Sequence, residues 1–111
     1  MTALAPYLSA FLLDHLPRER KASPHTTDAY ANSFKLLVCF AAARLHVKPF
    51  QIEIEELDAP MILAFLEHIE SDRGNTARTR NARLAAIHSF FRFLEYRFVS
   101  WIRRAEFMRS P

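Results

Sequence analysis

Glycine is almost missing from this chain, since Gly74 is the only one among 111 residues. Tight β-hairpins and the loops that cradle phosphate groups depend on glycine, because it adopts positive φ angles at little steric cost. Half of the residues are hydrophobic, and a chain of this length has room for one core. We therefore expect a single all-α domain, folded as a compact bundle of four to five helices.

Caps and apolar periodicity predict where the helices lie. Pro17 is expected to end the first helix, while Ser23 and Asp58 are placed to cap the second and third, each with a proline just inside. Gly74 supplies the turn before the fourth helix. The expected helices span residues 3–16, 24–44, 59–71 and 76–98.

Two segments lie outside these four helices. Phe50–Glu55 alternates as a strand does, but no second strand signal accompanies it. We interpret it as an extended connection whose Phe50, Ile52 and Ile54 pack on the bundle, with a true strand as the alternative. Val99–Met108 is predicted to form a short terminal helix. The expected division is a helical domain over 1–98 and a terminal segment over 99–111.

The fourth helix has two chemically different faces at helical spacing. Its core seam is expected to comprise Leu84, Ile87, Phe91, Leu94 and Phe98, widened by Phe90. The opposite face carries Arg78, Asn81, Ala85, His88, Ser89 and Arg92, flanked by Arg80 and Arg83. Small residues between long cations let a helix approach a major groove, where Arg recognises guanine and Asn recognises adenine. A merely solvated face remains the alternative.

Charge is distributed unevenly along the chain. Residues 73–111 hold nine arginines and two acids, a net charge of +7, while residues 1–72 hold six basic and ten acidic residues, a net charge of −4. Clustered arginine creates a local positive potential that attracts a polyanion. The sequence therefore predicts nucleic acid as the partner, and an acidic protein surface stays open as a second reading.

Several motifs resemble the N-terminal core-binding domain of tyrosine recombinases and phage-type integrases. They are Ser23–Tyr30 (SPHTTDAY), Leu57–Ala59, and Asn75–Leu94, in which RLAAIHSFFRFL is the most specific stretch. The resemblance spans about residues 8–104. It implies a SAM-like helical bundle that forms one half of a clamp on recombination-site DNA.

In that family the second and fourth helices supply much of the DNA contact. Carried over position by position, the resemblance implies DNA-binding roles on both helices, and the composition of the fourth helix adds His88. The candidate DNA-binding residues are Thr26, Asn32, Lys35, Arg78, Thr79, Arg80, Asn81, Arg83, His88 and Arg92.

The catalytic motif of the family has no counterpart in this sequence. Family members cleave DNA with a tyrosine nucleophile, assisted by arginine, lysine and histidine groups. His15 and Arg18 have a His-x-x-Arg spacing, which we interpret as chance, and Tyr7, Tyr30 and Tyr96 are expected to be packing residues. We therefore expect 99–111 to lead toward an absent catalytic domain, and this chain not to be an enzyme.

The function expected is DNA binding within site-specific integration and recombination, without strand cleavage by this chain. The expected partners are double-stranded DNA and an intact recombinase or its catalytic domain, in the cytoplasm. No membrane, small-molecule substrate, cofactor or metal is expected, since the histidines are scattered and no phosphate-binding loop occurs. The alternative is a helical protein-interaction domain whose arginine face meets an acidic partner.

Overall fold

The computed structural model describes residues 2–71, 74 and 76–109, with side chains as far as Val99. Within this part, the chain forms α1 (Leu4–Ala10), η1 (Phe11–Glu19), α2 (Pro24–Leu45), η2 (Pro49–Gln51), η3 (Ile54–Glu56), α3 (Ala59–Ser71) and α4 (Ala77–Arg109). The described residues contain no strand, only one isolated antiparallel bridge between Ala3 and Glu53. The predicted all-α bundle is confirmed.

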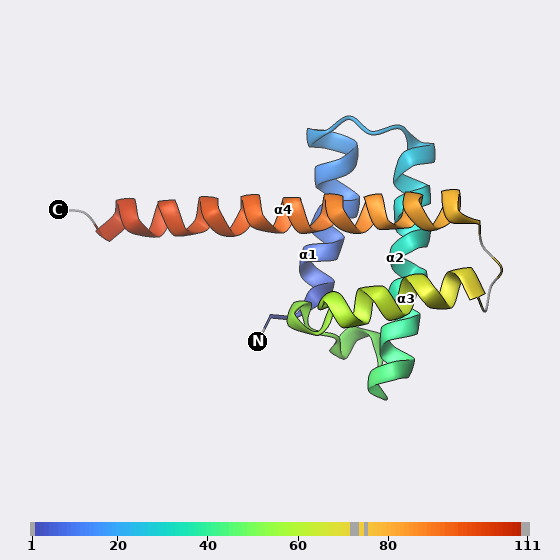
Figure 1. The fold of residues 1–111 in the computed structure, drawn as a ribbon. Coiled ribbons are helices and arrows are strands. Elements are labelled where there is room, and N and C mark those ends of the chain that lie inside the picture. The colour runs from blue at the N-terminus through green and yellow to red at the C-terminus, as the bar shows by residue number, and fades with distance from the viewer. Residues whose placement is uncertain (1, 72–73, 75, 110–111) are drawn as a thin grey trace.

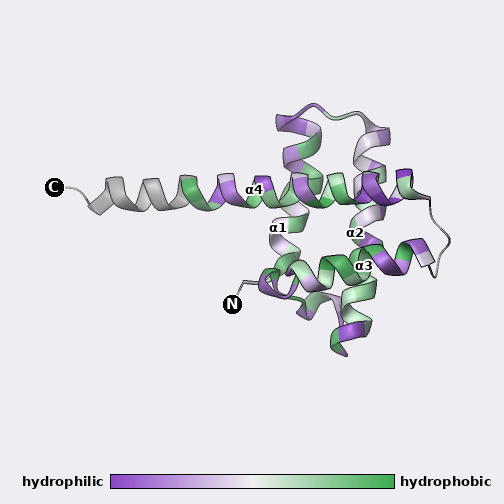
Figure 2. Cartoon of the chain, viewed as in Figure 1, coloured by the Kyte–Doolittle hydropathy of each residue, from purple (hydrophilic) through white to green (hydrophobic). Residues whose placement is uncertain are grey.

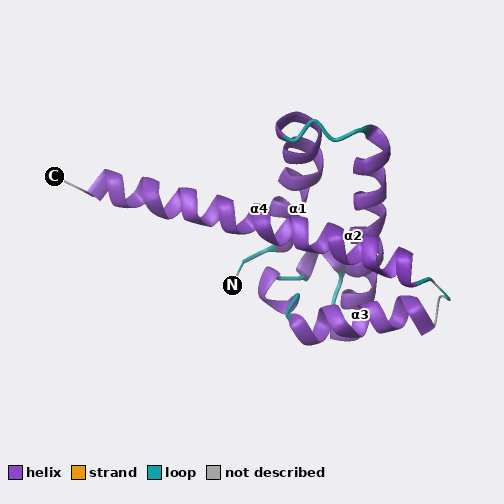
Figure 3. Cartoon of the chain, turned by 45° about the horizontal axis from the view of Figure 1, so that its top comes forward, coloured by secondary structure: helices purple, strands orange, loops and turns teal. Residues whose placement is uncertain are grey.

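The helices form two crossed pairs. The rod made by α1 and η1 runs beside α2 in the opposite direction, and α4 crosses both of them (Figure 1). Helix α3 lies alongside α4 and also runs opposite to it, as a second view confirms (Figure 3). Because α4 continues well past α1, the molecule is elongated, with principal extents of 58 × 33 × 20 Å.

The first helix continues beyond Pro17, so the predicted end at Leu16 is wrong. It changes from α to π geometry at Phe11 and ends at Glu19. In this stretch hydrogen bonds reach back five residues, as from the amide of Arg20 to the carbonyl of His15 at 2.8 Å. A proline in a helix lacks its N–H and clashes with the carbonyl four residues earlier, and the wider π turn accommodates both effects.

The predicted helix starts are confirmed by their capping bonds. The Oγ of Ser23 accepts a hydrogen bond from the backbone N–H of Thr26 at 3.2 Å. At the start of α3, Oδ1 of Asp58 accepts one from the N–H of Met61 at 3.0 Å. Gly74, in the turn before α4, has the expected positive φ of 66°. These local signals set the helix boundaries because they satisfy amides that have no partner inside the helix.

The connection between α2 and α3 is neither a strand nor a plain extended segment. It consists of the two short turns η2 and η3 on either side of Ile52, which is buried and whose carbonyl accepts the N–H of Leu4 at 3.1 Å. Ile54 packs at the edge of the core as predicted. Phe50 does not, because it lies inside the turn η2 and is 69% exposed.

Helix α4 extends further than predicted and buries a different stripe. Its 33 residues make a rod of about 50 Å, so the segment predicted as a separate terminal helix is the continuation of α4. Phe93 is buried together with Ala86, whereas Phe98 is 37% exposed. The buried stripe is shifted because α1 and α2 pack on one side of α4 and α3 packs on another. The division at residue 98 stays a prediction.

Aromatic rings occupy the centre of the core. Phe11 is fully buried, and its ring centroid lies 6.0 Å from that of Phe34, 5.3 Å from that of Phe90 and 5.4 Å from that of Phe93. We call these four rings the aromatic cluster. They join η1, α2 and α4, while hydrophilic and hydrophobic residues alternate along α4 as one side turns to solvent (Figure 2). The cluster therefore fixes which side of α4 stays exposed.

Candidate nucleic-acid interface

A groove of about 340 Å³ separates the first half of α2 from the first turns of α4. Four of the predicted DNA-binding residues line it together, namely Asn32 from α2 and Arg78, Thr79 and Arg83 from α4. The other lining residues are Ala29, Tyr30, Ser33 and Ala82. The structure thus brings the two helices that the sequence analysis singled out to one site.

Arg83 lies deeper in this groove than predicted. It does not stand on the solvent flank of α4, because its Nη1 donates a hydrogen bond to Oγ of Ser33 at 3.1 Å. The same hydroxyl donates to the carbonyl of Ala29 at 3.0 Å. The Nε of Arg83 is buried without a hydrogen-bond partner among the described residues. A buried unpaired donor is costly, by roughly 1–3 kcal/mol. The Nη protons that Ser33 does not use make this guanidinium a candidate ligand contact.

Three other candidates already have partners in the protein. Arg80 turns toward α3, where its Nε lies 3.5 Å from Oε1 of Glu70. The hydroxyl of Thr79 is hydrogen-bonded to that of Thr76, and the hydroxyl of Thr26 is hydrogen-bonded to that of Ser23. Both threonines therefore take part in capping at the helix starts, and their side chains are less free to bind a ligand.

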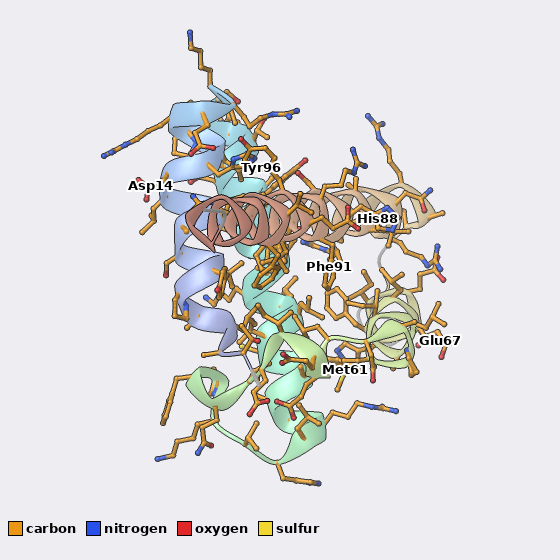
Figure 4. The ribbon with its side chains drawn as sticks, turned by 90° about the vertical axis from the view of Figure 1, so that its left-hand side faces the viewer. Asp14, Met61, Glu67, His88, Phe91 and Tyr96 are labelled. Carbon is orange, nitrogen blue, oxygen red and sulfur yellow. The ribbon has the colours of Figure 1, made fainter. Side chains whose placement is uncertain are left out.

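The outward face of α4 matches the predicted one. Asn81, Ala85, His88 and Arg92 are exposed along it, while Phe91 extends from α4 into the space beside α3 (Figure 4). Neither Arg78 nor Arg92 forms an ion pair with any described residue. By contrast, Arg80 and Arg97 each lie within 4.0 Å of a glutamate oxygen. Among the α4 arginines whose side chains are described, the unpaired ones are thus on its outward face and at the groove.

Lys35 is exposed on α2 but does not line the groove. The sequence analysis missed Tyr30 and Ser33, which form the groove's inner wall. Its spacing could have indicated Ser33, because it is a polar residue three positions after Tyr30 and four before Leu37, and so lies on the apolar stripe of α2. Its polar side chain is buried in the described core, with 5% exposure, and a buried polar group requires a hydrogen-bond partner.

The two residues with the His-x-x-Arg spacing, His15 and Arg18, do not lie together in a site. The imidazole of His15 packs 4.8 Å from the ring of Phe93 and its Nδ1 lies 2.8 Å from an oxygen of Glu19. Arg18 points to solvent, 3.6 Å from an oxygen of Asp14. Tyr96 is 67% exposed, so its prediction as a packing residue is wrong. The His-x-x-Arg spacing therefore forms no site here, because the histidine packs in the bundle and the arginine faces solvent.

The described residues contain no cluster of three or more His, Cys, Asp or Glu side chains suited to a metal ion. None of the described helices combines the length and the apolar character needed to cross a bilayer.

Comparison with known families identifies the fold. The model of a family described as "Phage integrase, N-terminal SAM-like domain" matches residues 9–97. This match covers α2 and α3 completely and the part of α4 that carries the exposed arginine face. No solved structure matches the chain significantly.

Two curated relatives come from Sinorhizobium fredii (strain NBRC 101917 / NGR234). "Putative integrase/recombinase y4rC" is 47% identical over 94 residues, which is 85% of this chain and 28% of that protein. "Putative integrase/recombinase y4rD" is 49% identical over 88 residues, which is 79% of this chain and 31% of that protein. The chain thus spans less than a third of the length of these relatives.

Proposed function

Because the chain belongs to the family of phage integrase N-terminal SAM-like domains, we propose that it is a DNA-binding module of a site-specific recombinase. The observation that carries the proposal is the sorting of the arginines on α4. Arg78 and Arg92 have no acidic partner among the described residues and face outward, as a phosphate contact requires. The footprint proposed is the α2/α4 groove together with the outward face of α4.

In this footprint, arginines hold phosphates and side chains at the middle of the face contact base edges. Asn81 and His88 lie on the exposed side of α4 between Arg78 and Arg92, and the small Ala85 allows close approach to a groove of DNA. Phosphate contacts set register, and base-edge contacts set sequence preference. The proposed compartment is the cytoplasm, where such a module would meet its DNA.

We assign no strand cleavage to these 111 residues. The ring of Tyr7 packs in a tilted arrangement on that of Phe98, with centroids 5.4 Å apart, and Tyr30 packs beside Phe11. The proposed partner for cleavage is therefore a recombinase catalytic domain, in line with relatives named integrase/recombinase that extend well beyond the matched region.

Salt dependence tests the proposed footprint. Each phosphate neutralised contributes about −0.9 to the slope of log K against log salt. The double variant Arg78→Ala/Arg92→Ala should therefore bind duplex DNA more weakly and make the slope less steep by about 1.8. Fluorescence anisotropy with a labelled duplex at several salt concentrations measures both effects.

The matched control removes the same charge elsewhere. Arg18→Ala/Arg44→Ala deletes two exposed arginines, one on η1 and one at the far end of α2, and should leave the slope almost unchanged. If both double variants change the slope equally, binding depends on net charge alone and the footprint is wrong. An acidic protein that binds through Arg78 and Arg92 in place of DNA would favour the protein-interaction alternative.

A further inference from the structure

The inner wall of the α2/α4 groove holds a guanidinium in a fixed position. The Ser33 hydroxyl uses its proton on the Ala29 carbonyl, at 3.0 Å, and offers a lone pair to Nη1 of Arg83, at 3.1 Å. A guanidinium has five N–H donors in one plane. One Nη1 proton is used on Ser33, and the Nε proton is buried, so the remaining Nη protons are the donors left for a ligand.

Among the described residues, the groove contains positive charge without a counter-charge. Its lining includes Arg78 and Arg83 but no aspartate or glutamate, and neither arginine forms an ion pair with another described residue. Asn32 adds an amide group from α2 on the opposite wall. Three side chains with N–H donors thus line one groove. A phosphate group can accept from all three through its several oxygens, whereas a carboxylate has only two.

We infer that this groove is a binding subsite for a single phosphate group, with Arg83 as the inner clamp, Arg78 at the rim and Ser33 as the residue that positions Arg83. The inference rests on the proposed function, in which the phosphate belongs to the DNA backbone. The groove's volume of about 340 Å³ leaves room for the attached sugar as well. Inorganic phosphate shares the same chemistry and should occupy the same place.

Arginine side-chain NMR observes this subsite directly. In the ¹⁵N-labelled chain, the Nε–Hε resonance of Arg83 should shift on titration with inorganic phosphate, and again with a short DNA duplex. The Ser33→Ala variant should bind phosphate roughly five-fold more weakly, because one positioning hydrogen bond is lost. Arg83→Lys keeps the charge but loses the planar donors, and should weaken phosphate binding roughly ten-fold or more.

Two controls separate positioning from folding. The backbone amide spectra of Ser33→Ala and Arg83→Lys should stay dispersed and close to that of the parent chain, since neither change opens a large cavity. Arg44→Lys makes the same chemical change at the far end of α2, beside the ring of Phe40, and should leave phosphate affinity unchanged.

The outcomes distinguish this inference from the proposed function. If duplex DNA binds with the expected salt dependence while the Arg83 resonance and the Ser33→Ala affinity do not change, the subsite is refuted and the DNA-binding proposal stands. If phosphate shifts Arg83 but duplex DNA does not bind, the subsite stands and the DNA-binding proposal fails. A glutamate-rich peptide that shifts Arg83 at lower concentration than phosphate would overturn the assignment of the ligand.

Discussion

Arginines on one helix have very different environments in this protein. Along α4, Arg78 and Arg92 are exposed with no acid partner among the described residues, Arg80 meets a glutamate of α3, and Arg97 lies over the ring of Phe93 at 4.9 Å. Exposed ion pairs of this kind contribute only about 0–1 kcal/mol to stability. The main effect of these ion pairs is therefore to occupy some of the arginines, which leaves the others available to bind a polyanion.

Asn81 should determine sequence preference if α4 lies in a major groove. It is exposed at the middle of the outward face, and an asparagine can form a bidentate pair with adenine. We expect Asn81→Ala to cost roughly 1–3 kcal/mol on the preferred DNA site while leaving binding to unrelated DNA almost intact. Binding selections on a randomised duplex, followed by titrations on two chosen sites, measure this difference.

A buried neighbour provides the structural control. Ile87 is 2% exposed and faces the core, so Ile87→Ala should lower the free energy of unfolding by about 2–5 kcal/mol and affect DNA binding only through unfolding. An equal loss of affinity for every DNA sequence in Asn81→Ala would show that Asn81 contacts no base.

At the scale of elements, short-range signals set the helix starts, and packing sets how far the helices continue. Ser23 and Asp58 begin α2 and α3 through side-chain bonds to amides three residues ahead. Pro17, a strong local stop signal, fails to end η1 because the helix shifts to π geometry there. The burial of Phe11 and Leu16 on this rod favours the continued helix over an early end.

The cap at Asp58 should have a measurable effect on stability. Its Oδ1 accepts the Met61 N–H at 3.0 Å, and loss of such a cap costs about 0.5–2 kcal/mol. We expect Asp58→Ala to lower the midpoint of urea unfolding accordingly, and Asp58→Asn to retain most of the stability because the amide oxygen can still accept. Asp28→Ala, an exposed change in the interior of α2, should stay within about 0.5 kcal/mol of the parent. A loss from Asp58→Ala no larger than that would argue against the cap.

At the scale of the whole molecule, the aromatic cluster holds the crossed helix pairs together. The four rings come from three different elements. The centroid of Phe11 lies within 6.0 Å of each of the other three, and those of Phe34 and Phe90 are 5.3 Å apart. Contacts between elements so far apart in sequence form only when the bundle closes. The cluster therefore couples the stability of α4 to the orientation of its outward face, which is part of the proposed footprint.

Truncating one ring of the cluster should destabilise the entire domain. Phe11→Ala removes a fully buried ring and should cost about 3–5 kcal/mol, a large share of the roughly 5–15 kcal/mol typical of a folded domain. Phe50→Ala is the same chemical change at a site that is 69% exposed, and should cost less than about 0.5 kcal/mol. Thermal and urea unfolding measure the loss of stability in both variants. Comparable losses would contradict the placement of Phe11 in the core and of Phe50 outside it.

The sequence by itself determined the fold class, the helix starts and the polar face of the fourth helix, whereas the role of the second helix in the candidate interface was implied by the family resemblance. These properties depend on local terms, namely the scarcity of glycine, capping side chains and apolar spacing within one helix, and they need no knowledge of neighbouring elements. The same spacing could not show whether Phe93 or Phe98 is buried on α4, because their exposure depends on which helices cross α4 and where.

Only the tertiary structure decided which candidate residues come together and which already have partners. Arg80 and Arg83 are three residues apart on α4, yet one turns to Glu70 on α3 and the other to Ser33 on α2. Residues 33 and 83 are separated by 50 positions, and no local rule brings them within hydrogen-bonding distance. Their contact follows from the crossing of α2 and α4, which is set by packing of the shared core.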